Sequence, residues 1–116
     1  MSKRIDRVSE MIKREVSRIL IQEIKDPGIK FVTITYVKSS PDLKITKIYY
    51  TLLDDKTNRP AMQDKLNHAC GFIRTEVGRN LRLRYVPEIS FHYDTVADYA
   101  QHVEELIVQI KKGDKE

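Results

Sequence analysis

The chain has 116 residues, a formal net charge of +4 and one cysteine, and 41% of its residues are hydrophobic. This length predicts a single domain with its own core, since domains commonly contain about 100–150 residues. No apolar run approaches the roughly 18 residues of a membrane span, and the charged N-terminus lacks the apolar centre of a signal peptide. The composition therefore predicts a soluble cytoplasmic domain with no membrane partner and excludes a disulfide-stabilised secreted scaffold.

The charges are distributed unevenly along the chain. Residues 1–30 carry eight lysines and arginines against five acids, and residues 65–85 carry five against one. Residues 86–110 contain five acids and neither lysine nor arginine. Two basic segments followed by an acidic one predict a polarised surface that attracts an anionic partner. The alternative is a charged surface that interacts only with solvent.

The first half of the chain predicts one helix followed by two strands. Residues 3–25 carry apolar side chains at helical spacing and a row of cations on the opposite side. The helix should end at Asp26, because Pro27 disfavours a helical conformation in the residue before it. β-branched and aromatic runs at residues 31–37 and 44–53 predict an antiparallel hairpin around a turn at residues 39–42.

A second helix is predicted from Pro60, with an apolar stripe that includes Leu66 and Ile73. Gly71 lies inside this stripe, although an interior glycine costs a helix roughly 0.5–1 kcal/mol relative to alanine. It either permits close packing of another segment, or it ends one helix and starts the next, which would free backbone N–H groups for a phosphate. After Gly78 the period changes to alternation, so we expect an extended segment over residues 81–85.

The end of the chain predicts a third strand and a last helix. Apolar and polar residues alternate over residues 89–93, and Thr95 begins a capping-box pattern. The helix that follows should run to about residue 111, and residues 112–116 should form a short disordered tail. The order α-β-β-α-break-α-β-α predicts one α+β domain, residues 1–111, with helices packed on a three-stranded sheet.

Catalytic and metal-binding patterns are weak in this sequence. His68, His92 and His102 are scattered, and none has a metal-ligand spacing with Cys70. No G-x-S-x-G, H-E-x-x-H or glycine-rich phosphate loop occurs. We therefore expect a protein that is not an enzyme and that requires neither a metal nor another cofactor.

Two groups of cations form the candidate binding site for nucleic acid, because such groups attract phosphates whatever the base sequence. KH domains clamp a nucleic-acid backbone at a hinge between two helices, normally through a GXXG loop, and Ala69, Cys70 and Gly71 occupy that place here. An alternative role for Arg84 is an ion pair with an acid of the last helix. The candidate RNA-binding residues are Lys3, Arg4, Arg7, Arg14, Arg18, Lys25, Arg74, Arg79, Arg82 and Arg84.

Several stretches of the sequence resemble the bacterial ribosome-binding factor A family, and together they span nearly the whole chain. The run LRLRYVPEISF, from Leu81 to Phe91, is the most specific of them. The others are Arg4–Val8, Lys25–Pro27, Val32–Thr35, Ser40–Leu43 and Ala69–Arg74. The chain departs from the family pattern at Gly28, Thr46, Thr95 and Ala100, where arginine, alanine, serine and glycine are usual.

The resemblance implies a type II KH-like fold, in which an Ala-x-Gly kink replaces the GXXG loop. It implies a non-enzymatic assembly factor that binds the 30S subunit and 16S rRNA and promotes late 30S maturation, including processing of the 16S rRNA 5′ end, with a role in growth in the cold. An assembly GTPase or an initiation factor is the further partner expected, and the protein should be a monomer.

Two other functions remain open on the sequence. One is an adaptor whose basic face binds an acidic protein. The other is a generic binder of single-stranded RNA, for which exposed aromatic side chains between the cations would be typical. The sequence suggests no such aromatic side chains, which argues against the generic binder.

Overall fold

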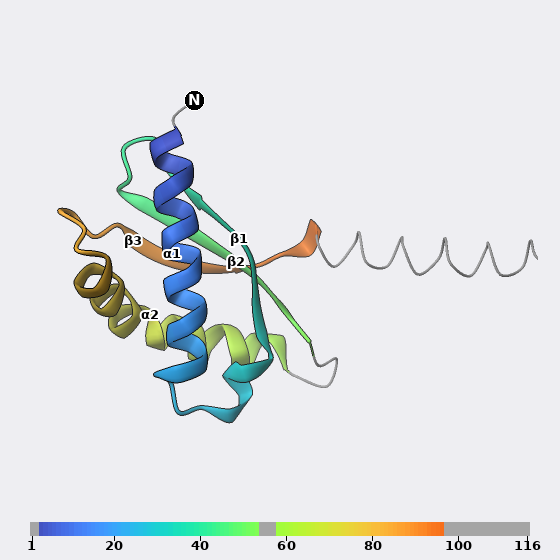
Figure 1. Cartoon of the computed structure of the whole chain (residues 1–116). Helices are drawn as coiled ribbons and strands as arrows, with labels where there is room; N and C mark the ends of the chain where they lie inside the picture. The colour runs from blue at the N-terminus through green and yellow to red at the C-terminus, as the bar shows by residue number, and fades with distance from the viewer. Residues whose placement is uncertain (1–2, 54–57, 97–116) are drawn as a thin grey trace, which may run out of the picture.

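The computed structural model describes residues 3–53 and 58–96. The elements are helix α1 (Lys3–Gln22), the short 3-10 helix η1 (Pro27–Phe31), strands β1 (Val32–Ser39) and β2 (Ile45–Leu52), helix α2 (Arg59–Leu81) and strand β3 (Glu88–Tyr93) (Figure 1). This order confirms the α+β class predicted from the sequence. Thr95 and Val96, where the predicted last helix begins, are helical, and the rest of that helix and the tail lie outside the described residues.

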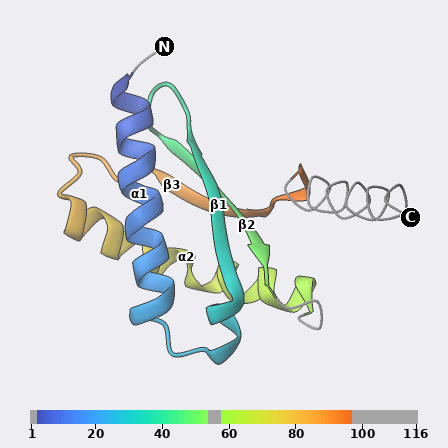
Figure 2. The same cartoon turned by 45° about the vertical axis from the view of Figure 1, so that its right-hand side comes forward.

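The three strands form one sheet in the order β1–β2–β3. β1 and β2 pair antiparallel as the predicted hairpin, whereas β2 and β3 pair in parallel, with α2 as the crossover connection that a parallel pair requires (Figure 2). Both helices contribute to one core on the same face of the sheet, α1 mainly against β1 and α2 mainly against β3. The opposite face carries exposed side chains such as those of Tyr36 and Lys47.

The core lies between the two helices and the sheet. The apolar stripe of α1 supplies Ile12, Val16 and Ile19, which are fully buried, as their spacing predicts. Ile48 and Tyr50 of β2 are buried opposite them. The remaining buried apolar residues are Leu20, Ile29, Ile34, Met62, Leu66, Ile73, Val77, Ile89 and Phe91. Because α1 and α2 share this core, it fixes the two helices relative to each other.

Three buried hydroxyl groups connect α1 to the hairpin. Ser9 Oγ donates to Ser39 Oγ at 2.8 Å, and Ser39 Oγ lies 3.2 Å from Thr46 Oγ1. A buried hydroxyl without a partner would be destabilising, so the three groups satisfy one another. The fully buried Thr46 hydroxyl is accommodated in this way.

The first helix ends earlier than the sequence predicts. The N–H groups of Glu23 and Ile24 both donate to the carbonyl of Ile19, at 2.9 and 3.2 Å, and so close the last turn of α1 after Gln22. The prediction of a helix through residue 25 is therefore wrong at its end. Lys25 lies beyond α1 and does not belong to its row of cations.

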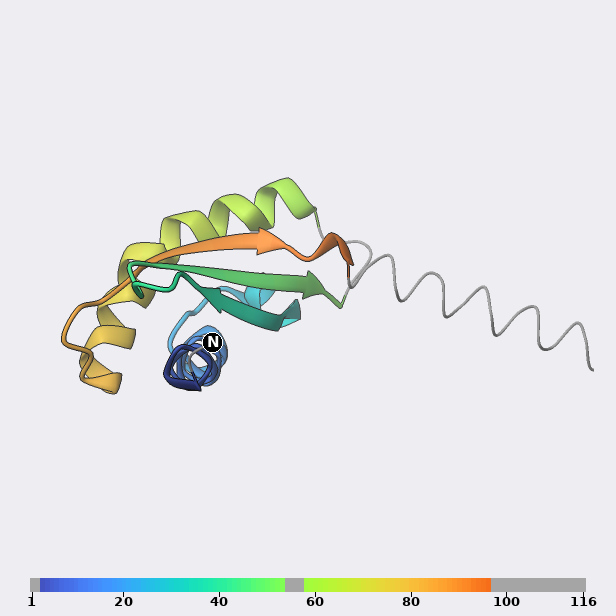
Figure 3. The same cartoon turned by 90° about the horizontal axis from the view of Figure 1, so that it is seen from above.

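α2 is continuous from Arg59 to Leu81, so the expected join of two helices at Gly71 is wrong. The helix instead bends, and its two halves point in different directions (Figure 3). The Thr75 hydroxyl donates to the carbonyl of Gly71 at 3.0 Å, and hydrogen bonds of this type compete with the helical ladder and bend helices. Gly71 therefore lies inside a bent helix and does not form a helix N-terminus.

The two glycines of α2 have different surroundings. A Cβ atom at Gly71 would meet nothing within 4 Å, so close packing does not explain this glycine either. A Cβ atom at Gly78 would lie 2.5 Å from Val86 Cγ2, an approach that only glycine allows. α2 ends with Arg82 in the left-handed conformation, at a φ of 52°, so the extended segment starts later than predicted.

Candidate nucleic-acid interface

The cations of α1 differ in how available they are to a ligand. Arg18 pairs with Glu15 at 2.6 Å and with Glu23 at 3.0 Å, and these carboxylates raise the pKa of Arg18 while offsetting its charge. Arg14 forms a longer ion pair of 3.8 Å with Glu10. The row of cations expected along this helix is therefore partly neutralised by its own neighbours.

Three other candidate cations in this part of the chain, Arg4, Arg7 and Lys25, are exposed. None of them pairs with a carboxylate among the described residues. Arg4 lies near the start of α1, whereas Lys25 lies beyond its end, so the two do not form one site. The side chain of Lys3 lies outside the described set.

Arg74 holds the loop between α2 and β3. Its Nε donates to the carbonyl of Pro87 at 3.1 Å, and its Nη2 donates to the carbonyl of Val86 at 2.9 Å. A guanidinium group suits this task because its donors form a rigid fork. Arg74 is therefore first a positioning residue for the loop, although the sequence placed it among the RNA contacts.

The other arginines of this region are all exposed. Arg79 forms an ion pair with Glu76, which lies three residues earlier on α2. Arg82 has no carboxylate partner among the described residues, and the same holds for Arg84. The acids of the last helix, which were the alternative partners for Arg84, lie outside the described residues. Arg82 and Arg84 are thus the available cations after α2.

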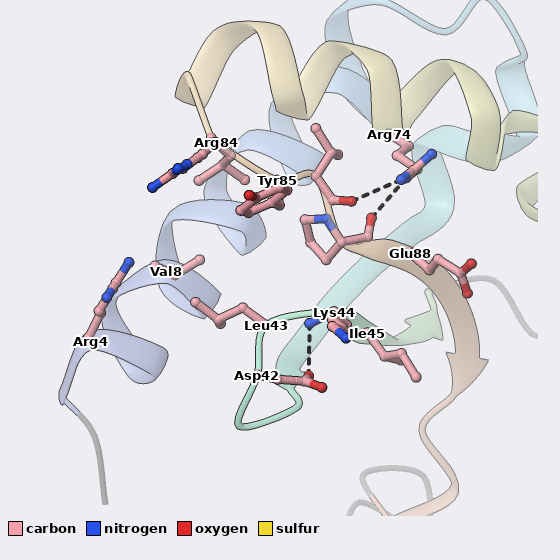
Figure 4. A pocket seen from close by; sticks show the side chains of 13 residues that line it. Arg4, Val8, Asp42, Leu43, Lys44, Ile45, Arg74, Arg84, Tyr85 and Glu88 are labelled. Atoms are coloured by element: carbon pink, nitrogen blue, oxygen red, sulfur yellow. Dashed lines mark hydrogen bonds between the residues drawn. The ribbon is translucent and has the colours of Figure 1, made fainter.

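A groove of about 760 Å³ lies between the start of α1, the β1–β2 turn and the loop from α2 to β3 (Figure 4). Four cations line it, and we call it the basic groove: Arg4, Lys44, Arg74 and Arg84. It gathers one cation of α1 with two of the arginines that follow Gly71. The groove therefore brings together members of both groups of cations that the sequence predicts as RNA-binding. The candidate cations that do not line it are Arg7, Arg14, Arg18, Lys25, Arg79 and Arg82.

The wall of the basic groove is partly apolar and partly acidic. Val8 and Leu43 lie opposite Tyr85 across the groove (Figure 4). Asp42 and Glu88 add two carboxylates, so cations outnumber acids by four to two. Hydrogen bonds from the Ser40 hydroxyl and from the Lys44 N–H lower the pKa of Asp42. The Asp42 carboxylate therefore stays charged and repels anions. An anionic ligand is attracted mainly at the arginines.

Backbone hydrogen bonds fix the hairpin side of the groove. Leu43 adopts a φ of 59°, which is uncommon for a residue other than glycine, and its N–H donates to the carbonyl of Ser40 at 2.9 Å. The N–H of Glu88 donates to the carbonyl of Lys44 at 2.8 Å, at the start of β3. The turn and the loop after α2 are thus joined, which gives the groove a defined shape.

Tyr85 is the most exposed aromatic side chain of the described residues, with 77% of its surface accessible. The Arg84 guanidinium carbon lies 5.5 Å from the centroid of its ring, within the range of a cation–π contact. The expectation that no exposed aromatic side chain accompanies the cations is therefore wrong. In the alternating segment over residues 81–85, Tyr85 has the same phase as Leu81 and Leu83, which are half-buried, but the loop turns Tyr85 outward.

A smaller hollow of about 340 Å³ continues from the basic groove toward the bend of α2. It shares Arg74, Arg84, Tyr85 and Val86 with the groove and adds Thr75. Thr75 lies one helical turn after Gly71. The bend and the groove are consequently neighbouring features of one surface.

The remaining residues of the expected kink contribute little chemistry. Ala69 and Cys70 are half-buried and pack against the core. Burial raises the pKa of the Cys70 thiol, which disfavours the reactive thiolate. Among the described residues, no group of three or more His, Cys, Asp and Glu side chains could hold a metal ion. Within the same residues, no helix is both long and apolar enough to cross a membrane.

Replacing Arg74 with lysine tests its role in holding the loop. Lysine keeps the charge but loses the fork, so the free energy of unfolding should fall by about 1 kcal/mol. Urea unfolding followed by circular dichroism measures the change. Arg79→Lys is the matched control, because its exposed ion pair should contribute less than about 0.5 kcal/mol. Equal losses for the two variants would show that Arg74 does not hold the loop.

Two groove residues, Lys44 and Tyr85, were not among the candidates drawn from the sequence. A signal existed, since four of the stretches that carry the family resemblance meet at the groove: Arg4–Val8, Ser40–Leu43, Ala69–Arg74 and Leu81–Phe91. Their proximity in space could not be predicted, because it depends on how β3 pairs with β2.

Comparison with known proteins gives consistent results. The family model described as ribosome-binding factor A matches residues 4–107. Ribosome-binding factor A of Citrifermentans bemidjiense is 43% identical over 114 residues, which cover 98% of this chain and 96% of that protein. A protein of Thermotoga maritima solved by NMR has a TM-score of 0.68 at 31% identity, with 79% of this chain and 88% of that chain covered.

A further similar structure concerns a complex. It is a homology model of Thermus thermophilus ribosome-binding factor A, fitted into a cryo-electron microscopy map of a 30S complex. Its TM-score is 0.60 at 20% identity, and the match covers 72% of this chain and 88% of that chain. At this identity the likeness concerns the fold.

Proposed function

Because this chain belongs to the ribosome-binding factor A family, we propose that it binds the 30S ribosomal subunit and contacts 16S rRNA. The similarity to relatives extends over nearly the whole chain, which is the observation that carries the proposal. The Thermus thermophilus protein of the same fold, fitted into a 30S complex, supports the same partner. The basic groove is the surface that suits contact with rRNA, because its exposed arginines can bind phosphates.

The finer parts of the function follow from the same proposal. The protein promotes late maturation of the 30S subunit, including processing of the 16S rRNA 5′ end, and supports growth in the cold. It acts in the cytoplasm as a monomer, without catalysis or a cofactor, and an assembly GTPase or an initiation factor releases it. Binding would favour the mature conformation of rRNA by the difference in affinity between two states of the subunit.

Arg4 and Arg84 are the main phosphate contacts of this proposal. Both are exposed at the rim of the basic groove, and they come from distant parts of the chain (Figure 4). Phosphate contacts supply affinity, while the folded shape of the rRNA supplies most of the selectivity. Arg7, on the next turn of α1, extends this basic surface.

The bend of α2 provides a second contact. Gly71 is exposed, and the space over its Cα atom is open, so an rRNA backbone can approach the helix closely there. This approach gives a reason for a glycine that otherwise only costs helix stability.

Replacing Gly71 with alanine should therefore separate stability from binding. The free energy of unfolding should rise by about 0.5–1 kcal/mol, because alanine favours the helix and its Cβ meets no neighbour. Affinity for 30S subunits should fall by about fivefold, roughly 1 kcal/mol, because the methyl group obstructs the backbone. Thermal unfolding and co-sedimentation measure the two effects. If the variant is more stable and binds 30S subunits equally well, rRNA does not contact the bend.

Deletion of the gene tests the proposed function as a whole. The 16S rRNA 5′ ends should remain unprocessed and free 30S subunits should be depleted after a shift to low temperature. Primer extension and sucrose-gradient profiles measure these effects, and re-expression of the chain should restore both. Normal ends and normal 30S levels would refute the maturation role. Crosslinking of the protein to ribosomal proteins alone, with no adduct to 16S rRNA, would favour an adaptor instead.

A further inference from the structure

The basic groove has features that phosphate binding alone does not require. Its wall is largely apolar at Val8, Leu43 and Tyr85, although phosphates are best bound by polar groups. Tyr85 exposes 77% of its surface beside Arg84, which has no carboxylate partner in the part of the chain that the structure describes. Its volume of about 760 Å³ lies within the range of roughly 300–1,000 Å³ that is typical of pockets for small organic ligands.

We propose that the basic groove binds an unpaired nucleotide of RNA, with its base against Tyr85 and its phosphates at Arg4 and Arg84. The inference rests on the proposed function, because it assumes that the partner is RNA. It goes beyond that function, since the groove then holds a base as well as the backbone. The ligand is consequently a single-stranded or flipped-out residue, because the bases of a duplex are stacked and inaccessible.

The distribution of charge in the groove orients this nucleotide. Arg4 and Arg84 lie on one side, while Glu88 lies toward the other side, beyond Tyr85, together with Lys44, whose charge it offsets (Figure 4). Arg74 also lies on that side, but its guanidinium already donates to the carbonyls of Val86 and Pro87. A carboxylate repels phosphates but accepts hydrogen bonds from the amino group of a base such as cytosine. The phosphates therefore lie at the arginines, and the base edge points toward the carboxylate.

The stacking surface is available in the free protein. Arg84 is the cation nearest to the Tyr85 ring, at 5.5 Å from its centroid, and both residues belong to the loop that Arg74 holds through two carbonyls. The loop is therefore positioned before RNA arrives, which reduces the entropy lost on binding. An acidic peptide could also pair with the arginines, but it would gain little from an exposed tyrosine ring, so RNA is the ligand favoured here.

The test measures binding of the full chain to a fluorescein-labelled hexacytidylate by fluorescence anisotropy. Tyr85→Ala should weaken binding by at least about fivefold, because stacking on one aromatic side chain accounts for such a factor or more. Tyr85→Phe keeps the ring and should change the affinity by less than about twofold. Tyr36→Ala is the matched control, since this tyrosine is 45% exposed on β1, away from the groove, and should bind as the wild type does.

The outcomes distinguish this inference from the proposed function. Wild-type protein that binds 30S subunits but not the oligonucleotide, or Tyr85→Ala protein that binds both normally, would overturn the base-binding groove and leave the 30S function intact. Loss of 30S binding in Tyr85→Ala with unchanged oligonucleotide binding would assign the groove to a ribosomal protein, and this also overturns the inference. Absence of 30S binding in the wild type would refute the proposed function itself.

Discussion

Exchange of Arg4 and Arg84 together for glutamine should weaken binding to purified 30S subunits by about 100-fold, equivalent to roughly 2.7 kcal/mol. Both side chains line the basic groove, and neither pairs with a carboxylate among the described residues. A hydrogen bond from a charged group contributes about 1.5–3 kcal/mol, so the loss of two phosphate contacts accounts for the effect. Quantitative co-sedimentation with 30S subunits at fixed salt measures it.

The salt dependence and a matched variant identify the cause. Loss of two phosphate contacts should reduce the slope of log affinity against log salt by about 1.4–1.8. The control is Lys38→Gln with Lys47→Gln, which removes the same charge from two exposed lysines that pair across β1 and β2. Its affinity should change by less than about threefold. Equal losses in the two double variants would mean that net charge, rather than the groove, controls binding.

The elements of the fold could be predicted because they depend on local spacing. The buried stripe of Ile12, Val16 and Ile19 follows the helical period, and the two strands of the hairpin show β-branched runs separated by a turn. The end of α1 was missed because two N–H groups share the carbonyl of Ile19, a detail that no residue pattern reveals. The break at Gly71 was predicted wrongly because helical context overcame the low propensity of one glycine.

The candidate site was less accessible to sequence reasoning. Arg79 and Glu76 lie three positions apart on α2, so the spacing alone predicts an ion pair that partly neutralises the charge of Arg79. The bonds of Arg74 to the carbonyls of Val86 and Pro87 depend on the course of a loop, and the spacing contains no such information. Loop geometry also decides that Tyr85 faces solvent, so the aromatic surface on which the proposed base binding depends could not be predicted from the spacing.

The second large effect is expected from Gly78→Val, which should lower the free energy of unfolding by about 3 kcal/mol, near the upper end of overpacking costs. Even a Cβ atom at this position would lie 2.5 Å from Val86 Cγ2. Val86 cannot move away freely, because its carbonyl accepts from Arg74 at 2.9 Å and the following Pro87 is buried. Urea unfolding followed by circular dichroism gives the change in free energy.

Gly71→Val is the matched control for this effect, because it makes the same substitution in the same helix where no neighbour lies within 4 Å. Glycine and valine differ by less than about 0.5 kcal/mol in helix propensity, so this variant should be nearly as stable as the wild type. Val86→Ala should restore about 1 kcal/mol or more to Gly78→Val while destabilising the wild type, since the clash is with Val86 itself. Gly78→Val and Gly71→Val could instead destabilise the protein equally, or Val86→Ala could cost as much in Gly78→Val as in the wild type. Either result would mean that bulk at Gly78 does not act through the loop. The loop's close approach to α2 would then not be what places Arg84 and Tyr85 at the groove.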